Sequence, residues 1–204
     1  MGFEHVISLG LDESRFYSAI WNEVQKMGKH FEVTQTLTDE QQKNADCLLL
    51  PLNGALSREM IDRMPNLKYV GVNATGFDKI DIAYAREKGV IVTNIPGYST
   101  NAVAEFVFGT TLEHLRELSR AKKQAKEGDF SEASFNGSEI SDKTFGIIGL
   151  GQIGQKTGKI AKGFNCNVIY WSRNRKPEME KIGITYSKFE DVLSQSDFLS
   201  FHLE

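Results

Sequence analysis

Short apolar runs alternate with amphipathic stretches along the first hundred residues of this chain. Five runs, each bounded by Gly, Pro, Asn or Asp, cover residues 6–9, 31–33, 47–50, 69–72 and 90–92. Runs of this length and character are typical of buried parallel strands. The stretches between them favour helices over residues 14–27, 57–63 and 80–88. This alternation predicts an α/β fold, in which right-handed crossovers connect the strands of a parallel sheet.

The predicted helices carry recognisable local signals. In the first helix, Phe16, Ile20, Val24 and Met27 recur at helical spacing, so we expect them to form one buried face. Gly89 directly follows the third helix and is typical of a helix end.

The second half of the chain begins with a longer helical pattern. Residues 102–126 contain no Pro and predict one long helix, so we place a domain boundary near residue 100. Domain one then covers residues 1–100, and domain two covers residues 101–204. In domain two, residues 143–148, 167–171 and 198–202 are predicted strands. Three strands make half of a six-stranded doubly wound sheet, and we expect the first of them to have one unpaired edge.

Composition narrows the class of protein. The 204 residues carry a net charge of −3, so the chain has no excess of positive charge that would attract nucleic acid or an anionic membrane. The two cysteines exclude a disulfide-dense or Cys-rich zinc scaffold, and we expect no metal site. No apolar run approaches the roughly 18–20 residues of a spanning helix, and no basic leader precedes the first strand. We therefore expect a cytoplasmic protein.

A glycine-rich turn follows the first predicted strand of domain two. Its residues are Gly149, Leu150, Gly151, Gln152, Ile153 and Gly154, and a predicted helix and a second strand come next. In this setting Gly149 permits the tight turn, Gly151 lets the backbone approach a pyrophosphate, and Gly154 lets the helix pack closely. The N–H groups of Gln152 and Ile153 would face the phosphates at the helix N-terminus. Another adenosyl ligand, or a turn without a ligand, is the alternative.

The residues after the second strand bear on the choice of dinucleotide. An NAD site usually has an acidic residue there, whereas this chain has Ser172, Arg173, Asn174, Arg175 and Lys176. Cations bind a 2′-phosphate, and arginine does so with two parallel hydrogen bonds. We therefore favour NADP over NAD as the cofactor. The alternative is a solvated basic turn beside loosely bound NAD.

Polar turns follow two strands of domain one. Asn53 and Gly54 come after the third strand, and Thr75 and Gly76 come after the fourth. Ligands of open α/β sheets bind at the carboxyl ends of the strands, where the N–H groups of Thr75 and Gly76 could hold a carboxylate. Ordinary connecting turns are the alternative.

Three sequence blocks, in this order and at this spacing, resemble the D-isomer-specific 2-hydroxyacid dehydrogenase family. They cover residues 73–81, residues 92–105 and residues 143–154. Residues 170–176 look most like the NADP-using glyoxylate/hydroxypyruvate reductase branch. The resemblance implies a flavodoxin-like substrate domain followed by the first half of a Rossmann dinucleotide-binding domain. It also implies reversible hydride transfer between a nicotinamide and a small 2-oxo or 2-hydroxy acid.

The resemblance also implies roles for particular residues. Thr75 and Gly76 would hold the substrate, with Asn53 and Gly54 beside it, and Thr100 would contact the nicotinamide. Leu150, Gly151, Gln152 and Ile153 would line the pyrophosphate. Ser172, Arg173 and Asn174 would lie at the adenosine end, and His202 near the adenine or ribose.

The family's catalytic Arg, Glu and His lie beyond the third Rossmann strand, so the resemblance is to a C-terminally truncated member. We expect no catalytic residue within these 204 residues and hypothesise that they are inactive alone. A homodimer is expected, in which a second copy covers the long helix and the unpaired strand edge. The alternative function is that of a non-catalytic protein that binds NAD(P) and other partners.

Overall fold

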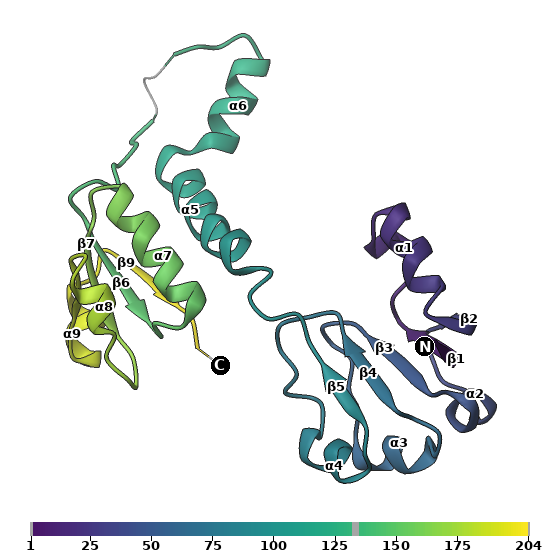
Figure 1. Ribbon diagram of the computed structural model, residues 1–204. Helices are drawn as coiled ribbons and strands as arrows, with labels where there is room; N and C mark the ends of the chain where they lie inside the picture. The colour runs from purple at the N-terminus through teal and green to yellow at the C-terminus, as the bar shows by residue number, and fades with distance from the viewer. Residues whose placement is uncertain (1, 132–134, 204) are drawn as a thin grey trace. The chain divides into compact units, whose positions relative to one another are not determined.

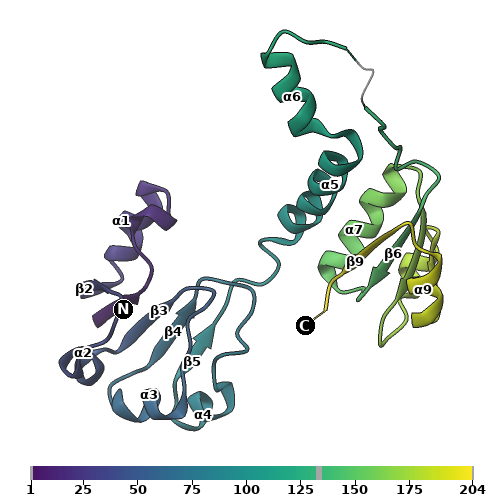
Figure 2. The ribbon, with the colours of Figure 1, turned by 180° about the vertical axis from the view of Figure 1, so that it is seen from behind.

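The chain forms two compact units, Met1–Tyr98 and Ser99–Glu204, in the computed structural model. The structure describes residues 2–131 and 135–203. Figures 1 and 2 show the two units from opposite sides, each with its own sheet.

The first unit is built on a parallel five-stranded sheet in the order β2-β1-β3-β4-β5. Its strands are β1 Phe3–Leu9, β2 Gly28–Thr34, β3 Cys47–Leu50, β4 Tyr69–Val72 and β5 Ile91–Thr93. Each apolar run therefore contributes a strand, and the α/β prediction is confirmed. The expected burial is wrong for β2, where Val33 is 44% exposed. As an edge strand, β2 pairs only with β1, so much of it faces solvent.

Helices cover the two faces of this sheet unequally (Figure 1). Three helices pack on one face, and the fourth helix lies on the other face after a short 3₁₀ turn, Glu13–Arg15. The three are α2 Asp39–Asn44, α3 Arg58–Arg63 and α4 Ile82–Glu87, and the fourth is α1 Ser18–Gln25. The main core of the unit lies beneath α2, α3 and α4, around Ile7, Leu48, Leu50 and Val70.

The prediction of the apolar face of the first helix is partly wrong. The helix is shorter than residues 14–27, Ile20 is 51% exposed, and Trp21 is the buried residue of α1. Trp21 packs edge-on against Phe31, with ring centroids 5.4 Å apart, and stacks on Phe16 at 5.3 Å. An indole buries more apolar area than an isoleucine side chain, so the helix is rotated to bury Trp21.

The second unit has a parallel four-stranded sheet in the order β8-β7-β6-β9. Its strands are β6 Thr144–Ile148, β7 Asn167–Trp171, β8 Ile184–Tyr186 and β9 Phe198–Phe201. The prediction of three strands missed β8, which is only 3 residues long. The expectation of an unpaired edge on the first strand is also wrong, because β6 pairs with both β7 and β9. The order in which strands are added to the sheet reverses after β8, because β9 pairs with β6 on the side opposite β7.

Five helices belong to the described part of the second unit. They are α5 Thr100–Arg116, α6 Leu118–Lys126, α7 Gln152–Gly163, α8 Pro177–Glu180 and α9 Phe189–Gln195. On the inner side of α5, Phe108 stacks on Phe145 of β6 and on Phe164, with centroids 5.3 Å apart in both pairs. None of the described helices is long and apolar enough to cross a membrane.

The single helix expected over residues 102–126 is two helices. Glu117 separates α5 from α6 in a left-handed conformation, with φ 47° and ψ 44°. The N–H of Ser119 donates to the Glu113 carboxylate at 2.8 Å, whereas the Leu115 carbonyl accepts from the N–H of Ser138 at 3.1 Å. In a continuous helix Ser119 and Leu115 would bond to each other. The returning chain satisfies this carbonyl instead, and the Glu113 carboxylate satisfies the Ser119 N–H.

Candidate functional site

A hollow of about 320 Å³ lies at the carboxyl ends of β6, β7 and β9. This is the edge where β9 lies on the opposite side of β6 from β7, and open α/β sheets bind ligands at such a reversal. The lining residues come from the glycine turn, the basic loop after β7 and the end of β9: Gly149, Leu150, Gly151, Trp171, Ser172, Arg173, Asn174, Lys176, His202 and Leu203. Segments about 50 residues apart in sequence therefore meet in one hollow.

Two glycines of the turn are required by close packing within the protein. Gly149 has φ 95°, and a Cβ there would lie 2.2 Å from the His202 carbonyl oxygen. A Cβ on Gly154 would lie 2.2 Å from the Gly149 carbonyl oxygen. The turn is held to β7 by the Gly149 N–H, which donates to the Trp171 carbonyl at 2.8 Å. These contacts bring the start of α7 close to the ends of the strands.

Gly151 differs from those two glycines. It precedes α7 with φ −73°, which any residue adopts, and a Cβ on it would meet nothing within 4 Å. Packing within the protein therefore does not require glycine at this position. No side chain caps α7, and the first N–H groups of a helix lack intrahelical partners. The open space and these donors together fit an anionic group such as a pyrophosphate.

The loop after β7 presents two of its three cations to the hollow. Arg173 and Lys176 line it, together with Ser172 and Asn174. The Ser172 hydroxyl donates to the Asn174 carbonyl at 2.6 Å, which tightens the loop. Arg175 is not among the lining residues.

His202 closes the hollow at the end of β9. Its N–H donates to the Ile148 carbonyl at 2.8 Å, and its Nε2 lies 3.0 Å from the Ser200 hydroxyl. Burial lowers the pKa of His202 below the usual 6.5, which favours the neutral ring. Trp171 and Leu203 were missed from sequence, although their positions at strand ends next to predicted residues could have suggested them.

Four expected cofactor residues besides Arg175 lie outside the lining. Gly154 packs beneath the turn, and Gln152 and Ile153 begin α7. Thr100 is the first residue of α5.

The residues expected to contact substrate lie in two adjacent turns of the first unit. Asn53 and Gly54 follow β3, and Thr75 and Gly76 follow β4. The turns adjoin because the Asn73 N–H donates to the Leu50 carbonyl at 2.8 Å. The side-chain amide of Asn94 donates a hydrogen bond to the Thr75 carbonyl oxygen at 2.7 Å. Within residues 2–131 and 135–203, the backbone N–H groups of Thr75 and Gly76 donate no hydrogen bond.

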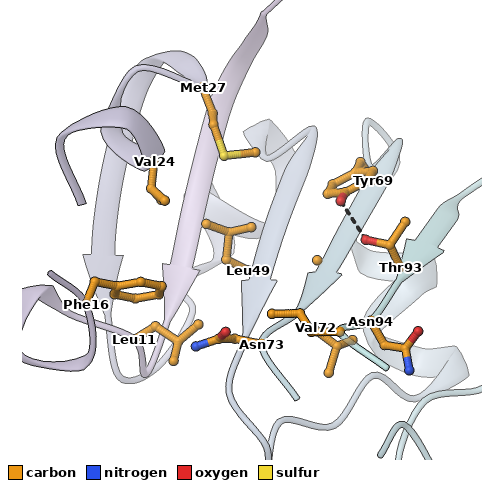
Figure 3. A pocket seen from close by; sticks show the side chains of 12 residues that line it. Leu11, Phe16, Val24, Met27, Leu49, Tyr69, Val72, Asn73, Thr93 and Asn94 are labelled. Carbon is orange, nitrogen blue, oxygen red and sulfur yellow. Dashed lines mark hydrogen bonds between the residues drawn. The ribbon is translucent and has the colours of Figure 1, made fainter. Parts of the chain in front are cut away.

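A second hollow, of about 170 Å³, lies on the α1 side of the same sheet. Figure 3 shows Phe16, Val24, Met27 and Leu49 among the side chains around it, and a dashed line joins the Tyr69 and Thr93 hydroxyls. These two hydroxyl oxygens lie 2.6 Å apart. Its lining is mainly apolar, with Asn73 and Asn94 as the amides. The four expected substrate residues do not line it. In the part of the chain that the structure describes, no group of three or more His, Cys, Asp or Glu residues could hold a metal.

Comparison with known proteins identifies the family. The family model described as "D-isomer specific 2-hydroxyacid dehydrogenase, NAD binding domain" matches residues 108–204. Residues 108–204 belong to the D-isomer-specific 2-hydroxyacid dehydrogenase family. The glycine turn, the basic loop and the strands that carry them all lie within the matched residues.

Curated proteins similar to the chain include several glyoxylate reductases. The chain is 37% identical to that of Thermococcus litoralis over 172 residues, which cover 80% of this chain and 52% of the relative. It is 34% identical to that of Pyrococcus furiosus, over 92% of this chain and 56% of the relative. The chain therefore spans about half the length of these relatives.

Solved structures of similar fold include two with bound dinucleotides. The D-lactate dehydrogenase of Aquifex aeolicus, solved with NAD and lactic acid, has a TM-score of 0.84 and 26% identity. That match covers 97% of this chain and 60% of the other. An acyclic imino acid reductase solved with NADPH and D-Arg has a TM-score of 0.77 and 30% identity, over 97% and 65% of the two chains.

Proposed function

We propose that the hollow of the second unit binds NADP(H), and that the chain is an oxidoreductase, or a fragment of one that still binds the dinucleotide. The reaction is reversible hydride transfer between the nicotinamide and a small 2-oxo or D-2-hydroxy acid. The unit Ser99–Glu204 is then the dinucleotide-binding domain, and Met1–Tyr98 is the substrate domain. The observation that carries this proposal is the space in front of Gly151 beside the uncapped start of α7.

The glycine turn and α7 would hold the pyrophosphate. The N–H groups of Gln152 and Ile153 have no hydrogen-bond partner among the described residues, so they are available as donors. The helix dipole favours negative charge at this end. Leu150 and His202 would flank the nucleotide. The cofactor, when bound, donates or accepts the hydride, and Thr100 is proposed to lie on its nicotinamide side.

The basic loop supports the choice of NADP. Arg173 and Lys176 face the hollow, and no carboxylate side chain is among its described lining residues. A 2′-phosphate would meet two cations and no opposing negative charge, whereas a ribose 2′-hydroxyl would lack its usual acidic partner. Similar structures contain NAD in one case and NADPH in another, so family membership alone leaves the cofactor open.

The substrate would bind at the turns after β3 and β4. The free N–H groups of Thr75 and Gly76 can donate to a substrate carboxylate, and Asn53 and Gly54 lie on the adjacent turn. Glyoxylate is the probe suggested by the curated relatives.

Titration calorimetry with NADPH, NADH and glyoxylate tests the proposal. We expect NADPH to bind more tightly than NADH, and glyoxylate to bind in the presence of NADPH. Dinucleotide binding without any response to glyoxylate would favour the non-catalytic alternative. Failure to bind either dinucleotide would refute the proposal. The cytoplasmic location, the homodimer and the inactivity of the 204 residues alone stay predictions.

A further inference from the structure

Arg175 is oriented differently from the other two cations of the loop. We propose that Tyr170, Glu180 and Arg175 form a brace that fixes the loop 172–176, so that Arg173 and Lys176 are the residues that select a 2′-phosphate. This inference rests on the proposed dinucleotide site and deepens it. Tyr170, Glu180 and Arg175 are positioning residues in this scheme, and none of them contacts the ligand.

The Tyr170 hydroxyl is the centre of the brace. Tyr170 lies on β7 and is fully buried. Its hydroxyl accepts a hydrogen bond from the Lys176 N–H at 2.7 Å and donates one to Glu180 Oε1 at 3.0 Å. The last residue of the loop is thereby tied to the strand from which the loop begins. Burial of this hydroxyl makes loss of either bond costly.

Glu180 engages the Arg175 side chain. Arg175 Nε donates to Glu180 Oε1 at 3.1 Å, and its Nη2 donates to the other carboxylate oxygen. The guanidinium also stacks over the Tyr186 ring, 4.9 Å from the centroid. Its charge and its donors are therefore used on the side away from the hollow.

Arg173 and Lys176 are in the opposite situation. Both line the hollow, and neither side chain forms an ion pair with any described residue. The element that follows them is anchored, because Met179 of α8 is buried in the core. The Ser172–Asn174 hydrogen bond tightens the other end of the loop. Two free cations on a loop held at both ends are pre-organised for an anion, which reduces the entropy lost on binding.

The test compares two probes that differ in the 2′-phosphate alone. Adenosine 2′,5′-bisphosphate and 5′-AMP are titrated into the full chain by calorimetry, and the ratio of their dissociation constants measures selectivity. Loss of folding would weaken both probes together, whereas loss of positioning changes the ratio. Lys159→Gln is the matched control, since Lys159 is an exposed cation of the same unit outside the hollow.

We expect Arg173→Gln and Lys176→Gln each to reduce the ratio about tenfold, which is typical of losing one charge-assisted hydrogen bond. Tyr170→Phe keeps the buried ring and should reduce the ratio about threefold or more while leaving the affinity for 5′-AMP nearly unchanged. Arg175→Gln should lower selectivity in the native background, where it removes the ion pair of Glu180 and leaves the Tyr170 hydroxyl as the donor to that carboxylate. It should have no further effect in a Glu180→Gln background, because the two side chains act as one unit.

An Arg175→Gln effect of about tenfold that persists in the Glu180→Gln background would show that Arg175 binds the phosphate directly, and would overturn the inference. An unchanged ratio in Tyr170→Phe would do the same. The native chain could bind adenosine 2′,5′-bisphosphate selectively while the variants of Tyr170 and Arg175 give these contrary results. In that case the proposed function stands and the brace is refuted. If the native chain binds neither probe nor NADPH, both fail.

Discussion

Replacing Gly151 by alanine should separate ligand binding from folding. In the native structure a Cβ at Gly151 meets nothing within 4 Å, and its φ of −73° suits alanine. The added methyl group would point into space that the proposed pyrophosphate needs. We therefore expect Gly151→Ala to fold normally and to lose affinity for NADPH.

The size of each effect follows from the contacts. Alanine is a poorer residue than glycine in front of a helix, but it also restricts the unfolded chain, so the free energy of unfolding should change by less than about 1 kcal/mol. Displacing the phosphates from even one backbone donor should remove about 1.5–3 kcal/mol of binding energy. That loss corresponds to a dissociation constant raised roughly 10-fold to 150-fold.

Chemical denaturation and calorimetry with NADPH measure the two quantities separately. Gly154→Ala provides the contrast, because its Cβ would lie 2.2 Å from a backbone oxygen and should cost about 1–3 kcal/mol of stability as well as binding. Gly163→Ala, at the other end of α7, also meets nothing within 4 Å and should leave binding intact. Unaltered NADPH affinity in Gly151→Ala would refute the assignment of this turn to the pyrophosphate.

Three further predictions concern stability, pH and assembly. Asp46 is buried, and its carboxylate accepts hydrogen bonds from the N–H groups of Glu4 and His5 at 3.1 and 3.0 Å. Burial alone would raise the pKa of Asp46, but these bonds and Lys68 hold that pKa below 3.8. Asp46→Asn should therefore lower the free energy of unfolding in urea by about 1.5–3 kcal/mol at pH 7. This loss should shrink as the pH falls below 3.8 towards the lowered pKa, where native Asp46 is itself protonated. A loss that is the same at every pH would contradict this. Because burial lowers the pKa of His202, thermal unfolding should show stability falling as the pH drops below 6.5, with a weaker fall in His202→Gln. Phe106 of α5 is 71% exposed. Phe106→Asp should turn the predicted homodimer into a monomer, as measured by light scattering. A native chain that is already monomeric would contradict the predicted dimer.

Local sequence patterns predicted the elements whose signals are short-range. Residues 47–50 and 69–72 match β3 and β4, and the glycine turn lies between β6 and α7 as its spacing indicates. Helix α2 was missed because residues 39–44 contain no apolar residue, although Thr38 and Gln41 form a capping box that could have revealed it.

Long-range contacts decided the features that the patterns predicted wrongly. The break at Glu117 depends on Ser138, which bonds to the Leu115 carbonyl from outside the helix. The burial of Trp21 in place of Ile20 depends on Phe31 in the neighbouring strand. No helical or strand period encodes a partner so distant in sequence.

The order of residues along the chain by itself determined the α/β class, the phosphate-binding type of turn after β6, and the presence of three cations after β7. Each of these depends on neighbouring residues, because turn geometry and strand character are local properties of the backbone. The tertiary structure alone decided which of those cations faces the hollow. Arg175 is held by Glu180 and Tyr186, whereas Arg173 and Lys176 line the hollow, because the buried Tyr170 hydroxyl and the packing of α8 set the path of the loop.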